Sequence, residues 1–238
     1  MHLSAAALGL VGLAAASPLG ERQVVPHYPT TSTSKGFHLV VNVTDPSKDF
    51  NPPIQNTYIT SIHVGPPLGL VGQVQSADRA RVFYQNGTAE ELRYSKSNVL
   101  SDGGSPPFPW GIKLFKDPNS DVVSTAHIDG GKGDAGIGLT GFPNPYTFLY
   151  PETWVACNES LPYYGGKHFI IFKQAQTTVG KDGSINKNVP DGCAPVRLLP
   201  ECTKLNDLPK GSQSSHEFAR DSQCYPDVKS LVWSEYGP

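Results

Sequence analysis

The segment Phe37-His38-Leu39-Val40-Val41-Asn42-Val43 carries the clearest information on the fold of this chain. Positions 37, 39, 41 and 43 are all apolar, and alternate side chains of a β-strand share one face. The segment is also rich in β-branched and aromatic residues, which favour strands. We therefore expect a strand over residues 37–43 that buries one face and exposes the other.

Similar short runs recur along the whole chain, separated by Gly, Pro, Asn and Asp. The 24 glycines and 22 prolines of the 238 residues far exceed the average share of roughly 12%, and helical spacing of apolar residues is almost absent. The sequence predicts an all-β fold, a single antiparallel sandwich or jelly-roll-like domain with long Gly/Pro loops. The further candidate strands are residues 58–64, 68–74, 81–85, 91–95, 112–115, 122–128, 146–150, 154–157, 168–173, 195–199 and 231–233.

Two local signals compete after residue 85. Asn86-Gly87 is the dipeptide that best suits a type I′ hairpin turn, whereas Thr88 and Glu91 have the spacing of a helix capping box. We favour the hairpin, because apolar and aromatic residues lie on both sides of the turn. The one modest helix candidate is residues 214–221, with Ser214 as its cap.

The first residues indicate where the protein acts. Residues 3–16 form an uncharged apolar run that ends in Ala14-Ala15-Ala16, although His2 stands where Lys or Arg is usual. The run is too short to span a bilayer and resembles a secretory signal peptide. We expect residues 1–16 to be a signal peptide, residues 17–34 a flexible Ser/Thr/Pro leader, and residues 35–238 a single β domain.

Four cysteines occupy the last third of the chain, at Cys157, Cys193, Cys202 and Cys224. In a secreted protein an even number predicts disulfides, and four cysteines allow three connectivities. If residues 154–157 run antiparallel to residues 193–199, Cys157 lies beside Cys193, and the other two form a clasp around the C-terminal part. Metal-binding Cys and His spacings are absent.

Three sequons are also consistent with an extracellular protein: Asn42-Val43-Thr44, Asn86-Gly87-Thr88 and Asn158-Glu159-Ser160. Each is a potential N-glycan acceptor. We expect the two Thr sequons to be used more readily than the Ser sequon.

Charge and hydropathy exclude two classes of partner. The 19 basic and 21 acidic residues are scattered, so no basic stripe is available to neutralise phosphates, and nucleic acid is not expected. Residues 231–238 are not the hydrophobic tail of a lipid-anchor signal, and no long apolar segment follows the signal peptide. We therefore expect no membrane partner.

The sequence contains no motif that is characteristic of a known enzymatic reaction. Residues 136–141 match the dinucleotide pattern GxGxxG, but Pro143 and Pro145 forbid the helix that must follow. His38, His63, His127 and His168 fall in candidate strands, where a histidine hydrogen-bonded to the backbone is the ordinary interpretation. Glycoside hydrolysis needs a carboxylate pair, and no pair can be singled out. We expect no enzymatic activity, no catalytic residue, no metal and no cofactor.

Aromatic residues near Pro and Gly give the best candidate binding surface. Trp110, Tyr163 and Tyr164 are expected in or beside loops, and a rigid ring there can stack on the apolar face of a sugar. The alternative is that these rings cap the β core, and this alternative has more weight for Trp110 than for the two tyrosines.

Several segments resemble a family of small secreted proteins of unknown function from filamentous fungi. The similar segments are residues 34–46, 82–88, 154–157 and 195–202, and the resemblance extends over nearly the whole chain after the signal peptide. Some members carry labels such as cell-wall or IgE-binding protein. The resemblance implies secretion and brings no catalytic residues.

The sequence thus favours a secreted, glycosylated, disulfide-bonded protein without enzymatic activity that binds in the extracellular space or the cell wall, with polysaccharide as one candidate ligand. An effector that acts on a host protein is nearly as well supported, and an extracellular glycoside hydrolase comes third. A flat group of aromatic rings would favour polysaccharide, whereas an acidic pair in an aromatic cleft would favour the hydrolase. A smooth surface with neither feature would favour the host protein.

Overall fold

The computed structural model describes residues 27–141 and 143–236. The expected signal peptide, residues 1–16, lies outside the described residues. Within the described part, no helix is long and apolar enough to cross a membrane. The α-helix is α1 (Ala89–Arg93), and the strands are β1 (Ser32–Ser34), β2 (Gly36–Val43), β3 (Tyr58–Gly65), β4 (Leu68–Val74), β5 (Phe83–Asn86), β6 (Asn98–Gly103), β7 (Phe108–Lys116), β8 (Val123–Gly130), β9 (Gly138–Leu139), β10 (Leu149–Tyr150), β11 (Trp154–Leu161), β12 (Lys167–Ala175), β13 (Thr178–Val179), β14 (Ile185–Asn186), β15 (Cys193–Thr203), β16 (Ala219–Arg220) and β17 (Ser222–Cys224).

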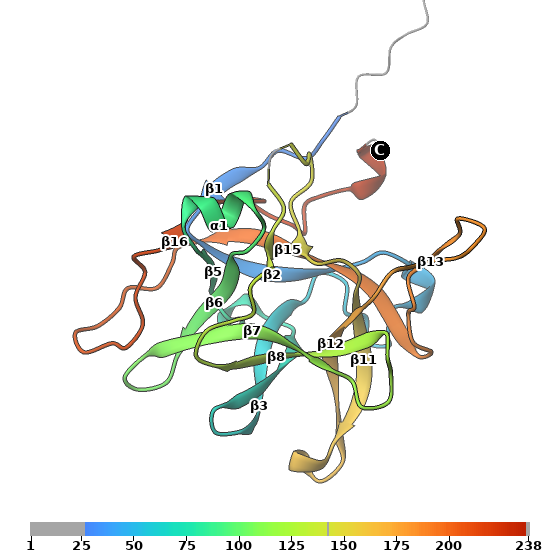
Figure 1. Ribbon diagram of the computed structural model, residues 1–238, viewed down its shortest axis with the longest axis horizontal. Coiled ribbons are helices and arrows are strands. Elements are labelled where there is room, and N and C mark those ends of the chain that lie inside the picture. The colour runs from blue at the N-terminus through green and yellow to red at the C-terminus, as the bar shows by residue number, and fades with distance from the viewer. Residues whose placement is uncertain (1–26, 142, 237–238) are drawn as a thin grey trace, which may run out of the picture.

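The all-β, antiparallel prediction is confirmed. Eleven strands form one sheet in the order β11-β15-β2-β3-β4-β12-β8-β7-β6-β5-β16. Additional pairings of β11 with β12, β2 with β5 and β4 with β8 curl this sheet into a ring (Figure 1). The strands therefore do not divide into the two separate sheets of a sandwich, and closure removes most free strand edges.

Strand β2 forms part of the wall of the ring, where it pairs with β15, β3 and β5. The side chains of Phe37, Leu39, Val41 and Val43 enter the main core, as the alternation predicts. The expectation of an exposed outer face is wrong, because Val40 on that face is fully buried. A second core, which includes Tyr225 and Val228 from the C-terminal part, covers it.

Two disulfides hold the C-terminal part in place. Cys157 on β11 is bonded to Cys193 on β15, directly opposite it in the antiparallel register. Cys202 is bonded to Cys224 at the end of β17. The pairing is the one that an antiparallel arrangement of β11 and β15 implies, and the second bond forms the expected clasp.

Glu201 connects this clasp to the outer face of the ring. Its carboxylate accepts hydrogen bonds from the Tyr58 hydroxyl, at 3.1 Å, and from the Val228 N–H, at 2.9 Å. Burial, followed by the negative charge of Glu201, raises the pKa of Tyr58 to about 12. The tyrosine therefore keeps its proton and donates to Glu201 throughout the physiological range.

The hairpin predicted at Asn86-Gly87 is wrong, and so is the strand over residues 91–95. Residues 89–93 form α1, because both bonds of the capping box are made: Thr88 Oγ1 accepts from the Glu91 N–H, and the Glu91 carboxylate accepts from the Thr88 N–H. The helix connects β5 to β6, which pair with each other on either side of it. Local capping therefore prevails over the turn propensity of Asn-Gly.

Three other expectations also need correction. Residues 214–221 do not form a helix, because residues 219–220 extend the sheet as β16 against β5. Residues 231–233 are not a strand, and a 3₁₀ turn follows at Trp233–Glu235. Part of the expected leader is structured, since β1 pairs with β17. Each outcome depends on partners distant in sequence.

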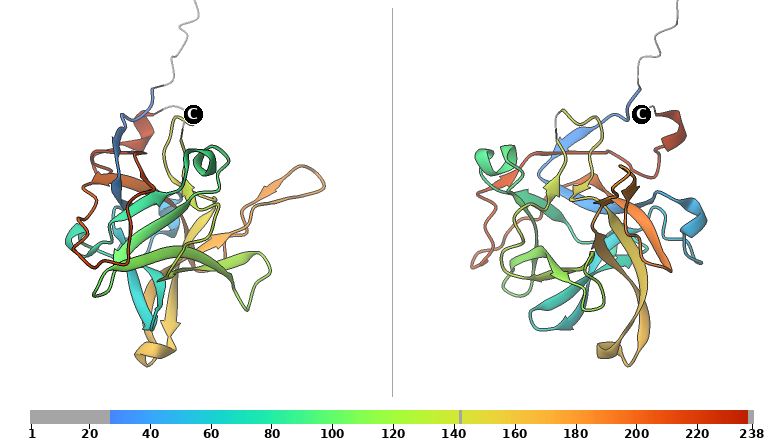
Figure 2. Two further views of the ribbon diagram at one scale, coloured as in Figure 1. Left: turned by 60° about the vertical axis from the view of Figure 1, so that its left-hand side comes forward. Right: turned by 45° about the vertical axis from the view of Figure 1, so that its right-hand side comes forward.

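We expect Leu39→Ala to lower the free energy of unfolding by about 2–5 kcal/mol, because it opens a cavity at a fully buried position. The matched control is Val179→Ala on the projecting β13–β14 hairpin (Figure 2), where the side chain is 72% exposed. The control should change stability by less than about 0.5 kcal/mol. Urea unfolding measures both, and equal effects would contradict the assignment of the core.

Candidate functional site

Four ring-bearing residues form an exposed group at the tips of two hairpins, which we call the tip cluster: His63, Tyr163, Tyr164 and Phe169. The ring centroids of Tyr163 and Tyr164 are 5.2 Å apart, those of Tyr164 and Phe169 are 4.8 Å apart, and those of His63 and Tyr163 are 5.6 Å apart. Tyr163 is 57% exposed and Tyr164 is 38% exposed. The structure thus brings together the two tyrosines predicted from the sequence and adds two neighbours.

Local structure holds these rings in place. Tyr163 and Tyr164 lie in a 3₁₀ turn that begins at Pro162 and ends at Gly165, which has a left-handed φ of 65°. The Tyr164 hydroxyl donates a 2.8 Å hydrogen bond to the His63 carbonyl oxygen of the β3–β4 hairpin. A ring fixed in this way loses little conformational entropy when it binds a partner.

The surroundings of the tip cluster combine apolar and cationic groups. The Lys167 ammonium lies 5.5 Å from the centroid of the Phe169 ring, and Leu68 at the start of β4 is 43% exposed. Among the described residues, no carboxylate makes a hydrogen bond or an ion pair with the four cluster residues. The arrangement can stack on a flat apolar face and offers no acid–base pair.

Trp110 belongs to the core and not to the tip cluster. The sequence places it in or beside a loop, but it lies within β7, opposite Ser101 of β6. Its ring is partly buried against the main core, 5.1 Å from Phe108, and the Arg81 guanidinium lies 5.3 Å from its centroid. In the described part of the chain, no ring contact joins Trp110 to either tyrosine of the tip cluster.

The four strand histidines have different surroundings. His38 Nδ1 lies 2.9 Å from the Arg81 carbonyl oxygen, in agreement with a backbone-bound histidine. His127 Nδ1 lies 3.5 Å from the carboxylate of buried Asp129. His168 Nδ1 lies 3.2 Å from Asn158 Oδ1 on the exposed β11–β12 surface. His63 is the one of the four that joins the tip cluster.

Sequence reasoning missed a histidine–carboxylate pair. His216 Nε2 lies 2.7 Å from Asp102 Oδ2, and the edge of the Tyr84 ring packs against the imidazole at 4.9 Å. Burial, and then the charge of Asp102, raises the pKa of Tyr84. In the described residues, no hydroxyl or thiol forms a hydrogen bond with His216, so the pair lacks the nucleophile of a catalytic triad. The two residues are too distant in sequence to form a recognisable motif.

A charged network crosses the sheet at Lys173. Its ammonium lies 2.7 Å from Asp117 and 2.8 Å from Glu159. Hydrogen bonding to Lys173 holds the pKa of Asp117 below its ordinary value. Burial alone would lower the pKa of Lys173, but its two carboxylate partners outweigh burial and raise it. The network is a set of satisfied ion pairs.

The structure also contains a groove that sequence analysis did not predict, which we call the C-terminal groove. Its volume is about 630 Å³, within the range of small-ligand sites. Aromatic, amide and charged side chains meet in it. The lining residues are Asn42, Val43, Thr44, Pro46, Asp49, Gln55, Tyr146, Arg197, Trp233 and Tyr236.

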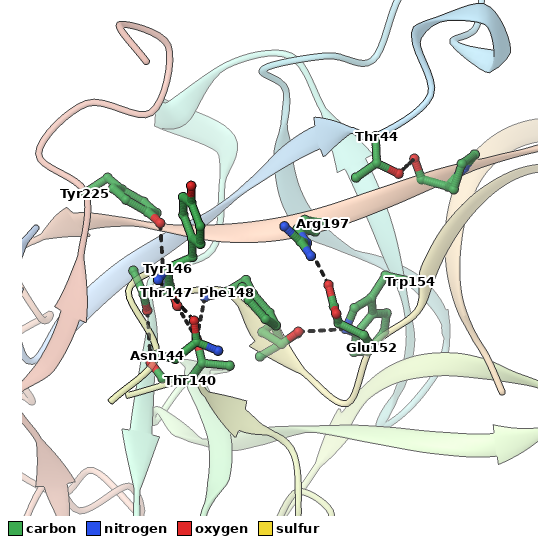
Figure 3. A network of polar contacts seen from close by, with 12 residues as sticks. Thr44, Thr140, Asn144, Tyr146, Thr147, Phe148, Glu152, Trp154, Arg197 and Tyr225 are labelled. Carbon is green, nitrogen blue, oxygen red and sulfur yellow. Dashed lines mark hydrogen bonds and ion pairs between the residues drawn. The ribbon is translucent and has the colours of Figure 1, made fainter. Parts of the chain in front are cut away.

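Hydrogen bonds fix the walls of this groove (Figure 3). Arg197 Nε donates to Glu152 Oε1 at 2.6 Å, and the Arg197 guanidinium lies 4.9 Å from the Phe148 centroid. The Thr147 N–H donates to the Tyr225 hydroxyl at 3.0 Å, which ties the loop that carries Tyr146 to the C-terminal part.

The Trp233 ring contacts the rings of Tyr146, Tyr225 and Tyr236. Its centroid is 6.3 Å from that of Tyr146 and 5.9 Å from that of Tyr225. These contacts bring the C-terminal segment to β2 and β15. Sequence analysis could not identify Trp233, because its contact with Tyr146 joins two segments that lie far apart along the chain.

The three sequons lie in different environments. Asn158 on β11 is exposed, whereas Asn42 on β2 and Asn86 on β5 are half-buried. Asn86 Nδ2 donates to Asn98 Oδ1 at 3.3 Å. The described residues include no group of three or more His, Cys, Asp or Glu side chains that could hold a metal ion.

Comparison with known proteins identifies the family. Residues 34–202 match the family described as Domain of unknown function (DUF7907). The chain is 61% identical over 223 residues to the protein named antigenic protein SchS34 of Stachybotrys chartarum, a match that covers 94% of this chain and 100% of the relative. No solved structure matches. The chain belongs to the DUF7907 family, whose function is unknown, and the expected kinship with fungal proteins is confirmed.

We expect Asp117→Asn to destabilise the protein at neutral pH, because it removes a carboxylate that Lys173 stabilises. A carboxyl whose pKa is lowered by folding stabilises the protein above its unfolded-state pKa and loses this effect as the pH falls through the folded-state pKa. The difference in unfolding free energy between the Asp117→Asn variant and the unmodified protein should therefore become smaller below about pH 4. Urea unfolding across the acid range measures it, and a difference that stayed constant down to about pH 2 would show a purely structural effect.

Proposed function

We propose that this chain is a non-enzymatic extracellular binding protein whose tip cluster binds a polysaccharide, such as one of the cell wall. The observation that carries the proposal is the exposure of two tyrosine rings that local structure holds in place. Tyr163 is 57% exposed and Tyr164 is 38% exposed. The Tyr164 hydroxyl is bonded to the His63 carbonyl oxygen, and the Tyr163 ring contacts the rings of His63 and Tyr164. Exposed aromatic groups of this kind mark interaction sites.

The chemistry of the tip cluster suits a sugar chain. A pyranose ring has an apolar C–H face that can lie on an aromatic ring, while its hydroxyl groups project sideways toward hydrogen-bonding partners. The Tyr163 hydroxyl, the His63 imidazole and the Lys167 ammonium can supply such partners around the rings.

Three observations support an extracellular location. Both pairs of cysteines form disulfides, and disulfides persist in oxidising compartments. Asn158 presents its sequon on an exposed strand. The apolar run at residues 3–16 has the form of a signal peptide.

The test is retention of the secreted, oxidised protein on insoluble chitin, β-glucan and cellulose, with released sugars assayed in the same tubes. We expect saturable retention without sugar release. The double variant Tyr163→Ala/Tyr164→Ala should bind about thirtyfold more weakly, because each stacked ring contributes of the order of 1 kcal/mol and two rings about 2 kcal/mol. The matched control is Tyr94→Ala, which removes a tyrosine that is 58% exposed beside α1.

Each contrary outcome contradicts a different part of the proposal. Unchanged retention of the double variant would contradict the tip cluster as the site. Sugar release would contradict the absence of enzymatic activity. A lack of retention on all three solids would contradict a polysaccharide ligand and would favour a host protein that docks on the same exposed rings and Leu68.

A further inference from the structure

All three residues of the sequon Asn42-Val43-Thr44 line the C-terminal groove. We propose that the occupant of this groove is the chain's own N-linked glycan, attached to Asn42, whose first sugars pack against Trp233 and Tyr146. The proposal rests on the extracellular location included in the proposed function, because N-glycans are added in the secretory pathway. It is independent of polysaccharide binding at the tip cluster.

The orientation of the Asn42 carboxamide is set by Gln55. Gln55 Oε1 accepts a hydrogen bond from the Val43 N–H of β2 at 2.6 Å, and this bond holds the Gln55 side-chain amide against that strand. Gln55 Nε2 then donates to Asn42 Oδ1 at 3.3 Å. This contact directs the oxygen of Asn42 toward Gln55 and leaves Nδ2, the atom that carries a glycan, without a hydrogen-bond partner among the described residues.

The position of Asn42 on the sheet directs a glycan into the groove. Asn42 on β2 is half-buried and lies opposite Arg197 on β15. The Arg197 side chain is held by an ion pair with Glu152 (Figure 3) and by contact with the Phe148 ring, so it forms one wall of the groove next to Asn42. A sugar bonded to Nδ2 therefore begins inside the groove and not in open solvent.

The walls of the groove have the composition that sugars require. The half-buried rings of Trp233 and Tyr146 line the groove and give it apolar area, and Asp49 and Arg197 add polar groups for the hydroxyl and acetamido groups of a sugar. A volume of about 630 Å³ is of the size that small ligands occupy. Packing of a glycan there would also hold the C-terminal turn at Trp233–Glu235 on the ring.

The other sequons provide contrasts within the same molecule. The Asn158 side chain is exposed, so a glycan there would extend into solvent. Asn86 Nδ2 already donates to Asn98 Oδ1, so a glycan there would have to share this nitrogen with a hydrogen bond to the neighbouring strand. Of the three sequon asparagines, Asn42 is the one that lines the C-terminal groove.

The experiment uses the full chain secreted from a eukaryotic host. Mass spectrometry of peptides gives the occupancy of each sequon, and the rate at which a peptide N-glycosidase removes each glycan is followed on the native protein and after denaturation. From the native protein we expect the Asn42 glycan to be released at least about tenfold more slowly than the Asn158 glycan, because the enzyme must wait for the groove to open. After denaturation the two rates should be equal.

Variants of the C-terminal segment test whether contact with Trp233 causes the slow release of the Asn42 glycan. Trp233→Ala should raise the native release rate at Asn42 to that at Asn158. The matched control, Val232→Ala, changes an adjacent residue that is 50% exposed and does not line the groove, and it should leave the difference unchanged.

Three results would overturn the proposal: an Asn42 without glycan, equal native release rates at Asn42 and Asn158, or a Trp233→Ala variant that keeps the difference. The first two need no variant, so a folding defect of Trp233→Ala does not decide the question. Retention on polysaccharide is measured on the same preparation. Slow release without retention would contradict only the function proposed for the tip cluster, and retention with fast release would contradict only the glycan site.

Discussion

Burial of strand β2 on both faces is the constraint on which the rest of the structure depends. Its inner face carries Phe37, Leu39, Val41 and Val43 into the main core, and its edges pair with β15, β3 and β5. Its outer face would leave Val40 in water if nothing covered it. The C-terminal part provides that cover, and the Cys202–Cys224 bond and Glu201 hold it there.

The two candidate surfaces follow from this arrangement. Asn42 on the outer face of β2 and Trp233 of the C-terminal part both line the C-terminal groove, so the groove lies next to this cover. At another part of the ring, the β3–β4 and β11–β12 hairpins extend beyond the core (Figure 2). Phe169 packs against a small apolar cluster within these hairpins, whereas Tyr163 and Tyr164 at the tip stay exposed. The bond from Tyr164 to the His63 carbonyl joins the two hairpins.

Local patterns in the sequence predict some of these features and not others. Alternation identifies β2, and Pro162 and Gly165 beside the tyrosines indicate an exposed, rigid turn. The pattern at Asn86-Gly87 misleads, because the Thr88–Glu91 capping box stabilises a helix that turn propensity alone does not reveal. Ring closure, the covered outer face and the groove depend on pairing between distant segments, such as β2 with β15, and no local pattern contains that information.

Native-state hydrogen exchange resolved by peptide tests the central role of β2 most directly. The account predicts that residues 37–43 are among the slowest to exchange, and that residues 224–228 share their protection as one cooperative unit. Replacement of Cys202 and Cys224 by Ser should then accelerate exchange in both segments together. Rapid exchange of residues 37–43, at the rate of the projecting β13–β14 hairpin, would contradict the account, as would protection of β2 that does not change when the clasp is removed.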